Sequence, residues 1–251
     1  MRRLALAAAL LLVAPFAWAQ DEETPPLPHP GWSFNGVFGT FDRAALQRGF
    51  QIYSEVCSNC HAMSLLHYRD LAALGYSEDE IKAIAAQKQV TDGPNDQGEM
   101  FQRPGRPADA FVSPYPNDKA ARAAHNGALP PDLSLIVKAR EGGADYVYGI
   151  LTGFVNPPAN FKLADGMSYD EYFPGEQIAM PQPLTDDSVT YADKTPALLP
   201  QEAHDVVTFL AWAAEPTMET RKRTGAKVML FLLAMTGVLY GAKRKIWSDL
   251  H

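Results

Sequence analysis

The chain has 251 residues, of which 47% are hydrophobic, and it carries 22 Lys and Arg against 29 Asp and Glu. This length suits one or two folded domains, and the net charge of −7 argues against a nucleic-acid binder, which needs clustered Lys and Arg to neutralise phosphates. Its two cysteines are too few for a disulfide scaffold or a zinc site with four thiolates.

Residues 1–19 are the first element in chain order. Two arginines precede an apolar run from Leu4 to Phe16, and a small-residue motif follows at 17–19. This order is typical of a cleaved secretory signal. A retained anchor helix is the weaker alternative, because the apolar run is short and Pro15 interrupts it. We therefore expect an exported mature chain that begins near Gln20.

An amphipathic helical pattern runs from Asp42, its expected N-cap, to Val56 and leads into Cys57-Ser-Asn-Cys60-His61. C-x-x-C-H is the attachment signature of c-type haem. Two thiols three residues apart can each reach one vinyl group, and the adjoining His61 can serve as the proximal iron ligand. A redox-active cysteine pair would need a βαβ context, and a zinc knuckle would need two further ligands nearby. Neither is present, so the motif predicts one covalently attached haem c.

Short helices and long loops are expected after the haem motif. A capping box at 77–80 predicts a helix to about Lys88, while five prolines and three glycines between 91 and 118 predict one long loop. No apolar alternation is long enough for a large sheet. Further helices are predicted over Leu133–Glu141 with Asp132 as the cap, over Asp145–Leu151, and over Pro200–Ala214.

The second axial ligand of an electron-carrying haem is usually a methionine thioether. Met180 is favoured, because Pro181 and Pro183 stiffen the loop around it. A histidine is the alternative ligand, without supporting context. The other candidates in the exported body are Met63, Met100, Met167 and Met218, and the histidines are His29, His67, His125 and His204.

The predicted membrane anchor covers residues 221–245, followed by a short tail at 246–251. Its uncharged stretch, extended to about 18 residues at 1.5 Å each, spans roughly 27 Å, close to the thickness of a hydrocarbon core. Basic clusters flank it on both sides, so the signal peptide must set the orientation. The exported domain, residues 20–220, then holds 13 basic and 28 acidic residues, a net charge of −15, which favours a cationic partner.

With these features together, the sequence resembles the cytochrome c1 family, the membrane-anchored haem subunits of the cytochrome bc1 complex. The resemblance covers essentially the whole mature chain. It is carried by the haem motif together with Arg48–Tyr53, Met63–Arg69, Asp92–Asn95, Pro114–Asn117, Asn126–Ser134, Tyr172–Gly175 and Ala213–Pro216.

The resemblance implies a mainly α fold: a class I cytochrome c-like haem domain with long loop insertions and a single C-terminal transmembrane helix. Cys57 and Cys60 match the thioether cysteines, His61 the proximal ligand and Met180 the distal ligand. Some bacterial members carry an extra cysteine pair before the distal methionine, and this chain lacks it. Five weaker matches concern the pocket: Arg140 near a haem propionate, Pro130 and Pro131 in the segment that can fix the proximal imidazole, and Tyr53 and Tyr146 in matching pocket segments. From the sequence alone, Arg140 could equally be a dipole partner in the last turn of a helix.

The implied function is one-electron transfer from the Rieske iron-sulfur protein to a cytochrome c, next to cytochrome b in a dimeric complex. No catalytic site of its own is expected. The location would be the bacterial inner membrane, with the haem domain on the periplasmic side. Two alternatives stay open: a tail-anchored haem protein with an open iron site, such as a peroxidase, and a haem-bearing assembly factor.

Overall fold

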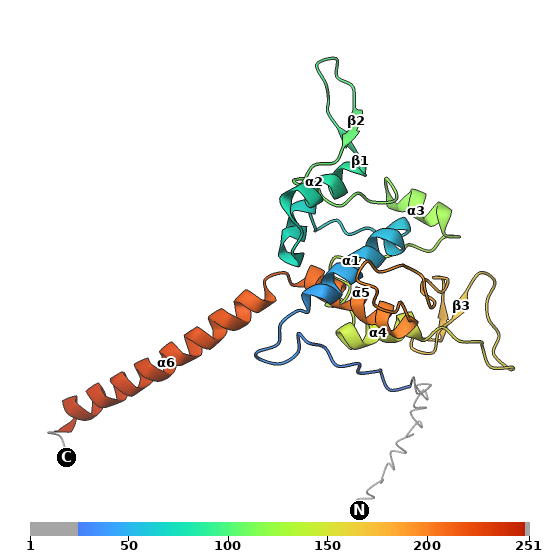
Figure 1. The fold of residues 1–251 in the computed structure, drawn as a ribbon. Coiled ribbons are helices and arrows are strands. Elements are labelled where there is room, and N and C mark those ends of the chain that lie inside the picture. Colours follow the sequence, from blue (N-terminus) through green and yellow to red (C-terminus); the bar gives the residue numbers. More distant parts are fainter. Residues whose placement is uncertain (1–24, 249–251) are drawn as a thin grey trace, which may run out of the picture.

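The computed structural model describes residues 25–248, so the predicted signal peptide and the last three residues lie outside the described part of the chain. Helices dominate, and two small antiparallel ladders complete the fold (Figure 1). The α-helices are α1 Arg43–Glu55, α2 Glu78–Ala86, α3 Asp118–Ala124, α4 Gly143–Thr152, α5 Leu199–Ala214 and α6 Met218–Ile246. The 3-10 helices are Cys57–Asn59 and Tyr68–Leu74, and the strands are β1 Gln89–Asp92, β2 Phe101–Pro104, β3 Ser168–Tyr169 and β4 Gln177–Ile178.

The core lies where α1 crosses α5. Asp42 caps α1 by accepting hydrogen bonds from the amides of Ala44 and Ala45, as the sequence predicts. Gly49 lets the two helices approach closely, because a Cβ at this position would lie 2.1 Å from the carbonyl oxygen of Asp205. The crossed helices confirm the predicted class of fold and fix the end of α1, from which the haem motif begins.

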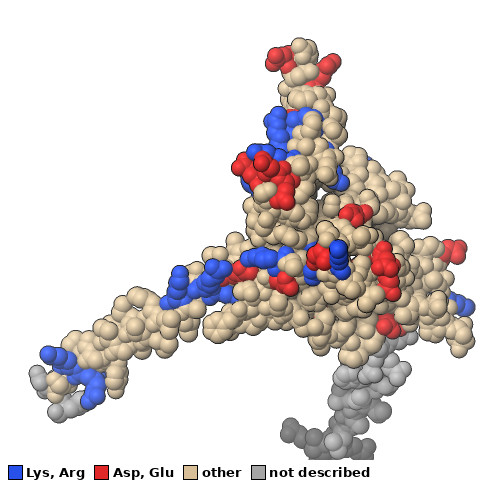
Figure 2. Space-filling model, viewed as in Figure 1, with Lys and Arg blue, Asp and Glu red and all other residues tan. Residues whose placement is uncertain are grey.

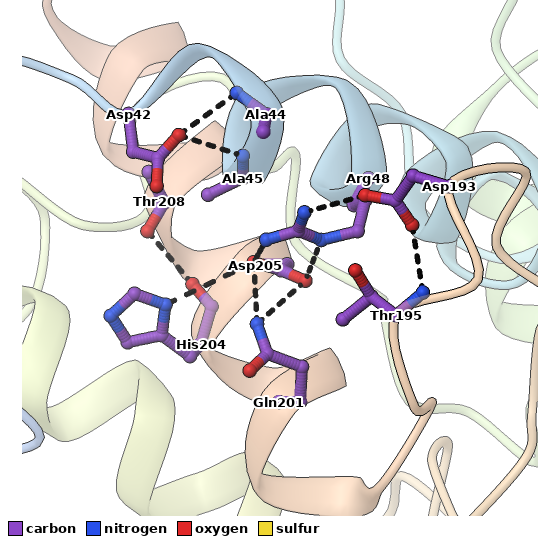
Figure 3. A network of polar contacts seen from close by, with 10 residues as sticks. All are labelled: Asp42, Ala44, Ala45, Arg48, Asp193, Thr195, Gln201, His204, Asp205 and Thr208. Atoms are coloured by element: carbon purple, nitrogen blue, oxygen red, sulfur yellow. Dashed lines mark hydrogen bonds and ion pairs between the residues drawn. The ribbon is translucent and has the colours of Figure 1, made fainter.

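A buried ion pair locks the same crossing (Figure 3). Arg48 of α1 donates to both carboxylate oxygens of Asp205 on α5, with nitrogen-oxygen distances of 2.7 and 3.0 Å. Asp205 is fully buried, whereas the second partner of Arg48, Asp193, is half exposed. Gln201 also donates to Asp205. The buried carboxylate is therefore fully hydrogen-bonded, which is the condition for burying a charge without a large penalty.

The predicted loop at 91–118 is only partly a loop. Ser77 and Glu80 form the expected capping box for α2, but β1 and β2 then pair in a hairpin that projects from the helical body (Figure 1). Arg103 on β2 pairs with Asp92 on β1 within the hairpin, and ties the hairpin to the body through an ion pair with Asp109. Cross-strand polar pairs hold this hairpin, and such pairs leave no apolar alternation in the sequence.

The helix predicted over 133–141 is wrong, because these residues form successive turns. Asp132 does not cap a helix here. One of its carboxylate oxygens accepts from the Ser134 amide and the other from the Ser64 amide, at 2.8 and 2.9 Å. Its side chain thus bridges this segment to the residues that follow the haem motif. Tertiary hydrogen bonds have replaced the local cap that the sequence pattern indicated.

The long helix α6 stands clear of the body, and its apolar side chains are exposed along its length. It is apolar and long enough to cross a membrane, and none of its most apolar window is buried. Lys and Arg gather at both of its ends, with an uncharged stretch between them (Figure 2). A single-pass membrane helix explains both features, since lipid replaces protein as the apolar environment.

Candidate functional site

The two cysteines of the haem motif lie on one turn directly after α1. The amides of Cys60 and His61 both donate to the Cys57 carbonyl, at 3.1 and 2.9 Å, so the motif closes into a single tight turn. Neither cysteine is in a disulfide, and both residues are half-buried. The turn therefore presents two thiols and an imidazole within five residues, as attachment of one porphyrin requires.

The protonation of Cys57 separates haem attachment from redox-active thiol chemistry. Burial, followed by the neighbouring Cys60, raises the pKa of the Cys57 thiol to about 12. A redox-active C-x-x-C pair depends on a lowered thiol pKa, because the thiolate is the nucleophile. The structure therefore disfavours the thioredoxin-like alternative on electrostatic grounds as well as by fold.

A backbone carbonyl fixes the His61 imidazole. Nδ1 of His61 lies 2.8 Å from the carbonyl oxygen of Pro131, which can only accept, so Nδ1 carries the proton and Nε2 keeps its lone pair. Burial lowers the pKa of His61 and keeps the ring neutral. A neutral ring with an oriented Nε2 is the form that binds iron. Of the two matched prolines, the contact belongs to Pro131, while Pro130 precedes it in the same segment.

The segment carrying Pro131 is braced against the chain after His61. The Leu133 amide donates to the Ala62 carbonyl at 2.8 Å, and the Leu65 amide donates to Ser134 Oγ at 3.1 Å. The Asp132 bridge described above lies between these two bonds. This brace is absent from the sequence-based prediction, because it joins residues nearly 70 positions apart. Its only local signal is the Asp-Leu-Ser turn at 132–134.

Arg140 and Tyr146 come close enough that the arginine charge influences the tyrosine hydroxyl. Burial raises the pKa of Tyr146, while Arg140 opposes that shift. The exposed guanidinium donates to the Ala139 carbonyl, and no ion pair of Arg140 is found within residues 25–248. Since no helix forms over 133–141, a dipole role is excluded. An arginine without an acidic partner beside a half-buried tyrosine suits a carboxylate such as a haem propionate.

Met180 is half-buried and lies two residues after β4, on a different segment from the haem motif. Strand β4 pairs with β3, with Ser168 opposite Ile178 and Tyr169 opposite Gln177. Beyond Met180, the side chain of Gln182 donates to the carbonyl of the fully buried Leu184. The segment is therefore tied to the body on both sides of the methionine.

The positions of the other methionines and of the histidines reduce the number of alternatives to Met180 as the second axial ligand. Met63 is fully buried in the core and Met218 is buried at the start of α6, whereas Met100 is 61% exposed on the projecting hairpin. Met167 is half-buried just before β3 and is the remaining competitor of Met180. The alternative histidines lie beside other partners: His29 and Asp145, His67 and Asp70, His125 and Tyr115, and His204 stacked on Trp32.

Tyr53 is a core residue. It is only 3% exposed, and its ring packs against Phe111 and Phe209. Cys57 lies close enough to contribute, after burial, to the raised pKa of Tyr53. Tyr53 therefore packs inside the core next to the haem motif and is not an exposed contact for a ligand.

The fold and this site define a c-type haem protein on a membrane anchor, since one turn supplies two thiols and an oriented neutral imidazole. Comparison with known proteins makes the class specific. The model of the cytochrome C1 family matches residues 32–250, and the chain belongs to this family.

Individual relatives agree with the family match. The chain is 46% identical to cytochrome c1 of Rhodospirillum rubrum, covering 99% of this chain and 97% of that protein. It is 50% identical to the mitochondrial haem protein cytochrome c1 1 of Arabidopsis thaliana, over 91% of this chain and 73% of the relative. It is also 47% identical to cytochrome b/c1 of Bradyrhizobium diazoefficiens, where 98% of this chain spans only 39% of the longer protein.

Membership of this family brings covalently bound haem c as the cofactor and electron transfer by haem in the bc1 complex as the class of function. Within residues 25–248, α6 is the one helix long and apolar enough to cross a membrane, which agrees with a single-pass membrane protein. The free thiols of the motif and the lone pair of His61 Nε2 fit this cofactor chemically.

Proposed function

We propose that this chain accepts electrons one at a time from a Rieske iron-sulfur protein and donates them to a cytochrome c, as the haem subunit of a bc1 complex with cytochrome b. The observation that carries the proposal is the fixed imidazole of His61, whose Nδ1 lies 2.8 Å from the Pro131 carbonyl. An electron carrier needs a ligand that does not move between redox states, because every movement adds to the barrier for transfer.

Each site residue has a definite task in this proposal. Cys57 and Cys60 form the two thioether bonds, His61 supplies the proximal nitrogen through Nε2, and Met180 supplies the distal sulfur. Haem c, when bound, provides a single reversible electron at its iron. A thioether ligand raises the reduction potential and closes the iron to small molecules. Arg140 would neutralise a propionate, with Tyr146 next to it.

The proposed location has the haem domain on the periplasmic side of a bacterial inner membrane, with residues 1–19 removed after export. The strongly acidic composition of residues 20–220 supports a basic electron acceptor, since opposite charges steer encounters and raise association rates. We further propose a dimeric complex.

The deciding experiment is purification of the complex from native membranes through a tag on this chain. We expect cytochrome b and the Rieske protein to copurify stoichiometrically, and quinol to reduce the haem rapidly. After removal of the Rieske protein, quinol should no longer reduce the haem, while a chemical reductant still does. Quinol reduction that survives this removal would contradict the proposed donor.

An open iron site, as in a peroxidase, is the competing function. A six-coordinate iron with a thioether ligand does not take up carbon monoxide in the reduced protein at neutral pH. Rapid carbon monoxide binding by the native protein, together with peroxide turnover, would favour the peroxidase. Stable association with cytochrome b in the absence of any haem reduction would instead favour an assembly role.

A further inference from the structure

Besides the haem site, the structure contains a groove where the folded body meets the first turns of α6. The groove has a volume of about 290 Å³. One wall is the loop at 37–40 and the other is the helix face at 219–227. The proposed electron-transfer role does not use this groove.

The loop wall presents two large apolar side chains at its tip. Val37 and Phe38 lie between Gly36 and Gly39 and are 69% and 87% exposed. Gly39 is obligatory, because a Cβ there would lie 2.0 Å from the Asn35 carbonyl oxygen. Two neighbouring apolar side chains held exposed on a tightly built loop mark a contact surface for an apolar partner outside the chain.

Hydrogen bonds hold this loop against the helix. The ammonium group of Lys222 donates to the carbonyl oxygens of Phe34 and Gly39, at 2.6 and 3.2 Å. The position of the apolar tip relative to α6 is thus fixed. Ala226, one turn after Lys222, lines the groove, and the uncharged stretch of the helix begins at Val228. The tip therefore lies at the level where α6 enters the hydrocarbon.

The helix wall is cationic. Arg223 and Lys227 are exposed and four residues apart on α6, a spacing that puts like charges on one helix face and is unfavourable unless an anion lies between them. Arg223 reaches Glu219 at 3.3 Å, but Glu219 also binds Arg43 at 2.8 Å. Lys227 has no ion pair within the described part of α6 or the body. The lining of the groove therefore holds three cationic side chains, Lys222, Arg223 and Lys227, and one carboxylate, that of Glu219.

We propose that this groove binds an anionic phospholipid of the adjoining leaflet. Its phosphate would lie between Arg223 and Lys227, and its acyl chains would run past Ala226 beside Val37 and Phe38. The combination selects this occupant: an apolar partner alone leaves Lys227 unpaired and Arg223 sharing Glu219 with Arg43, and a soluble anion leaves the apolar tip in water. A lipid with a net negative charge satisfies both.

The test is photolabelling in native membranes that contain the assembled complex. Two diazirine phospholipids with identical chains, a phosphatidylglycerol and a phosphatidylcholine, are added at equal amounts, and the labelled peptides are quantified by mass spectrometry. We expect the phosphatidylglycerol to label residues 33–40 at least about fivefold more than the phosphatidylcholine, since one cation near an anionic lipid is worth roughly that ratio.

Substitutions in the groove test whether the preference for the anionic lipid arises there. Arg223→Gln combined with Lys227→Gln should bring the two lipids to equal labelling, while the haem spectrum stays unchanged. The control is Arg221→Gln, which removes one positive charge near the start of α6 from a residue that is paired with Glu215 outside the groove. Phe38→Ser should lower labelling by both lipids. Equal labelling of the native chain by both lipids would overturn the site, and so would cross-links from this loop to a protein subunit in place of lipid.

Discussion

The two sides of the proposed haem site are built differently. On the proximal side, His61 follows a regular helix and is oriented by a segment that makes several backbone hydrogen bonds to the residues after it. On the distal side, Met180 lies on irregular chain held by a ladder of two residues per strand. The proximal ligand is therefore held by hydrogen bonds between two segments that are distant in sequence, whereas the proposed distal ligand lies on a loop.

The largest expected effect concerns the distal side. Met180→Leu removes the thioether but keeps an apolar side chain of similar volume, so the fold should survive while the iron loses a ligand. We expect the midpoint potential to fall by roughly 0.1 V or more, within the range of about 0.8 V that axial ligands span, and electron transfer from the quinol to the haem to slow sharply. Redox titration of the purified complex measures the shift.

Met167→Leu is the matched control for this experiment. It makes the same chemical change in the neighbouring strand segment and should leave the potential unchanged. If Met167→Leu lowers the potential and Met180→Leu does not, then the assignment of the distal ligand is reversed.

The next effect concerns the helix crossing that supports the proximal side. Asp205→Ala leaves the buried guanidinium of Arg48 without its main partner, and breaking a buried pair in this way costs about 3–5 kcal/mol. We expect a fall of this size in the free energy of unfolding, measured by urea denaturation of the full chain in detergent. Asp193→Ala removes the half-exposed partner of the same arginine and should cost less than about 1 kcal/mol. Equal losses in the two variants would show that the pair does not stabilise the crossing.

A smaller effect tests the close approach at the same crossing. Gly49→Ala places a methyl group against the Asp205 carbonyl, and overpacking of this kind costs about 1–3 kcal/mol. Gly225→Ala is the control, because that helical glycine has no atom within 4 Å of an added Cβ. Unfolding of the haem domain should respond only to the first change. If Gly49→Ala left the free energy of unfolding unchanged, the two helices could move apart at no cost in stability.

The sequence could predict those parts of the fold that depend on local signals. The Asp42 cap, the capping box at Ser77 and the apolar faces of α1 and α5 are local signals, and the elements form where those signals lie. The haem motif is equally local. The brace through Asp132 is not, because its partners are distant in sequence, and the same residue read locally gives a helix cap that does not form.

The β1–β2 hairpin was missed for a related reason. Its strands pair through polar side chains, such as Gln102 with Thr91, and Arg103 bridges it to the body. Patterns of apolar alternation cannot reveal such a hairpin, because neither face is buried. The sequence therefore predicts the elements that bury apolar surface well, and the polar insertions poorly.

The smallest expected effect returns to the distal side, where Asp170 holds the turn that leads to Met180. One carboxylate oxygen accepts from the amides of Tyr172 and Phe173, while the other is buried and has no partner. Burial raises the pKa of Asp170 to about 6. The native state therefore keeps a proton that the unfolded chain, with an ordinary carboxyl pKa, releases at lower pH. The stability contribution is full below about pH 4 and is lost as the pH rises through 6.

Asp170→Asn keeps the accepting oxygen and removes the charge. A pKa difference of about two units corresponds to about 3 kcal/mol, and the unpaired buried amide of the Asn costs roughly 2 kcal/mol in return. The variant should therefore gain stability relative to the native chain as the pH rises from 4 to 7 and exceed it by about 1 kcal/mol at neutral pH. Urea unfolding at a series of pH values gives this difference. Asp165→Asn, an exposed residue of the same region, should give a flat difference over the same range. A flat difference for Asp170→Asn as well would mean that water reaches the second oxygen. The polar groups of the distal turn would then all have hydrogen-bond partners, as those of the proximal brace do. The two sides would differ only in the shortness of strands β3 and β4.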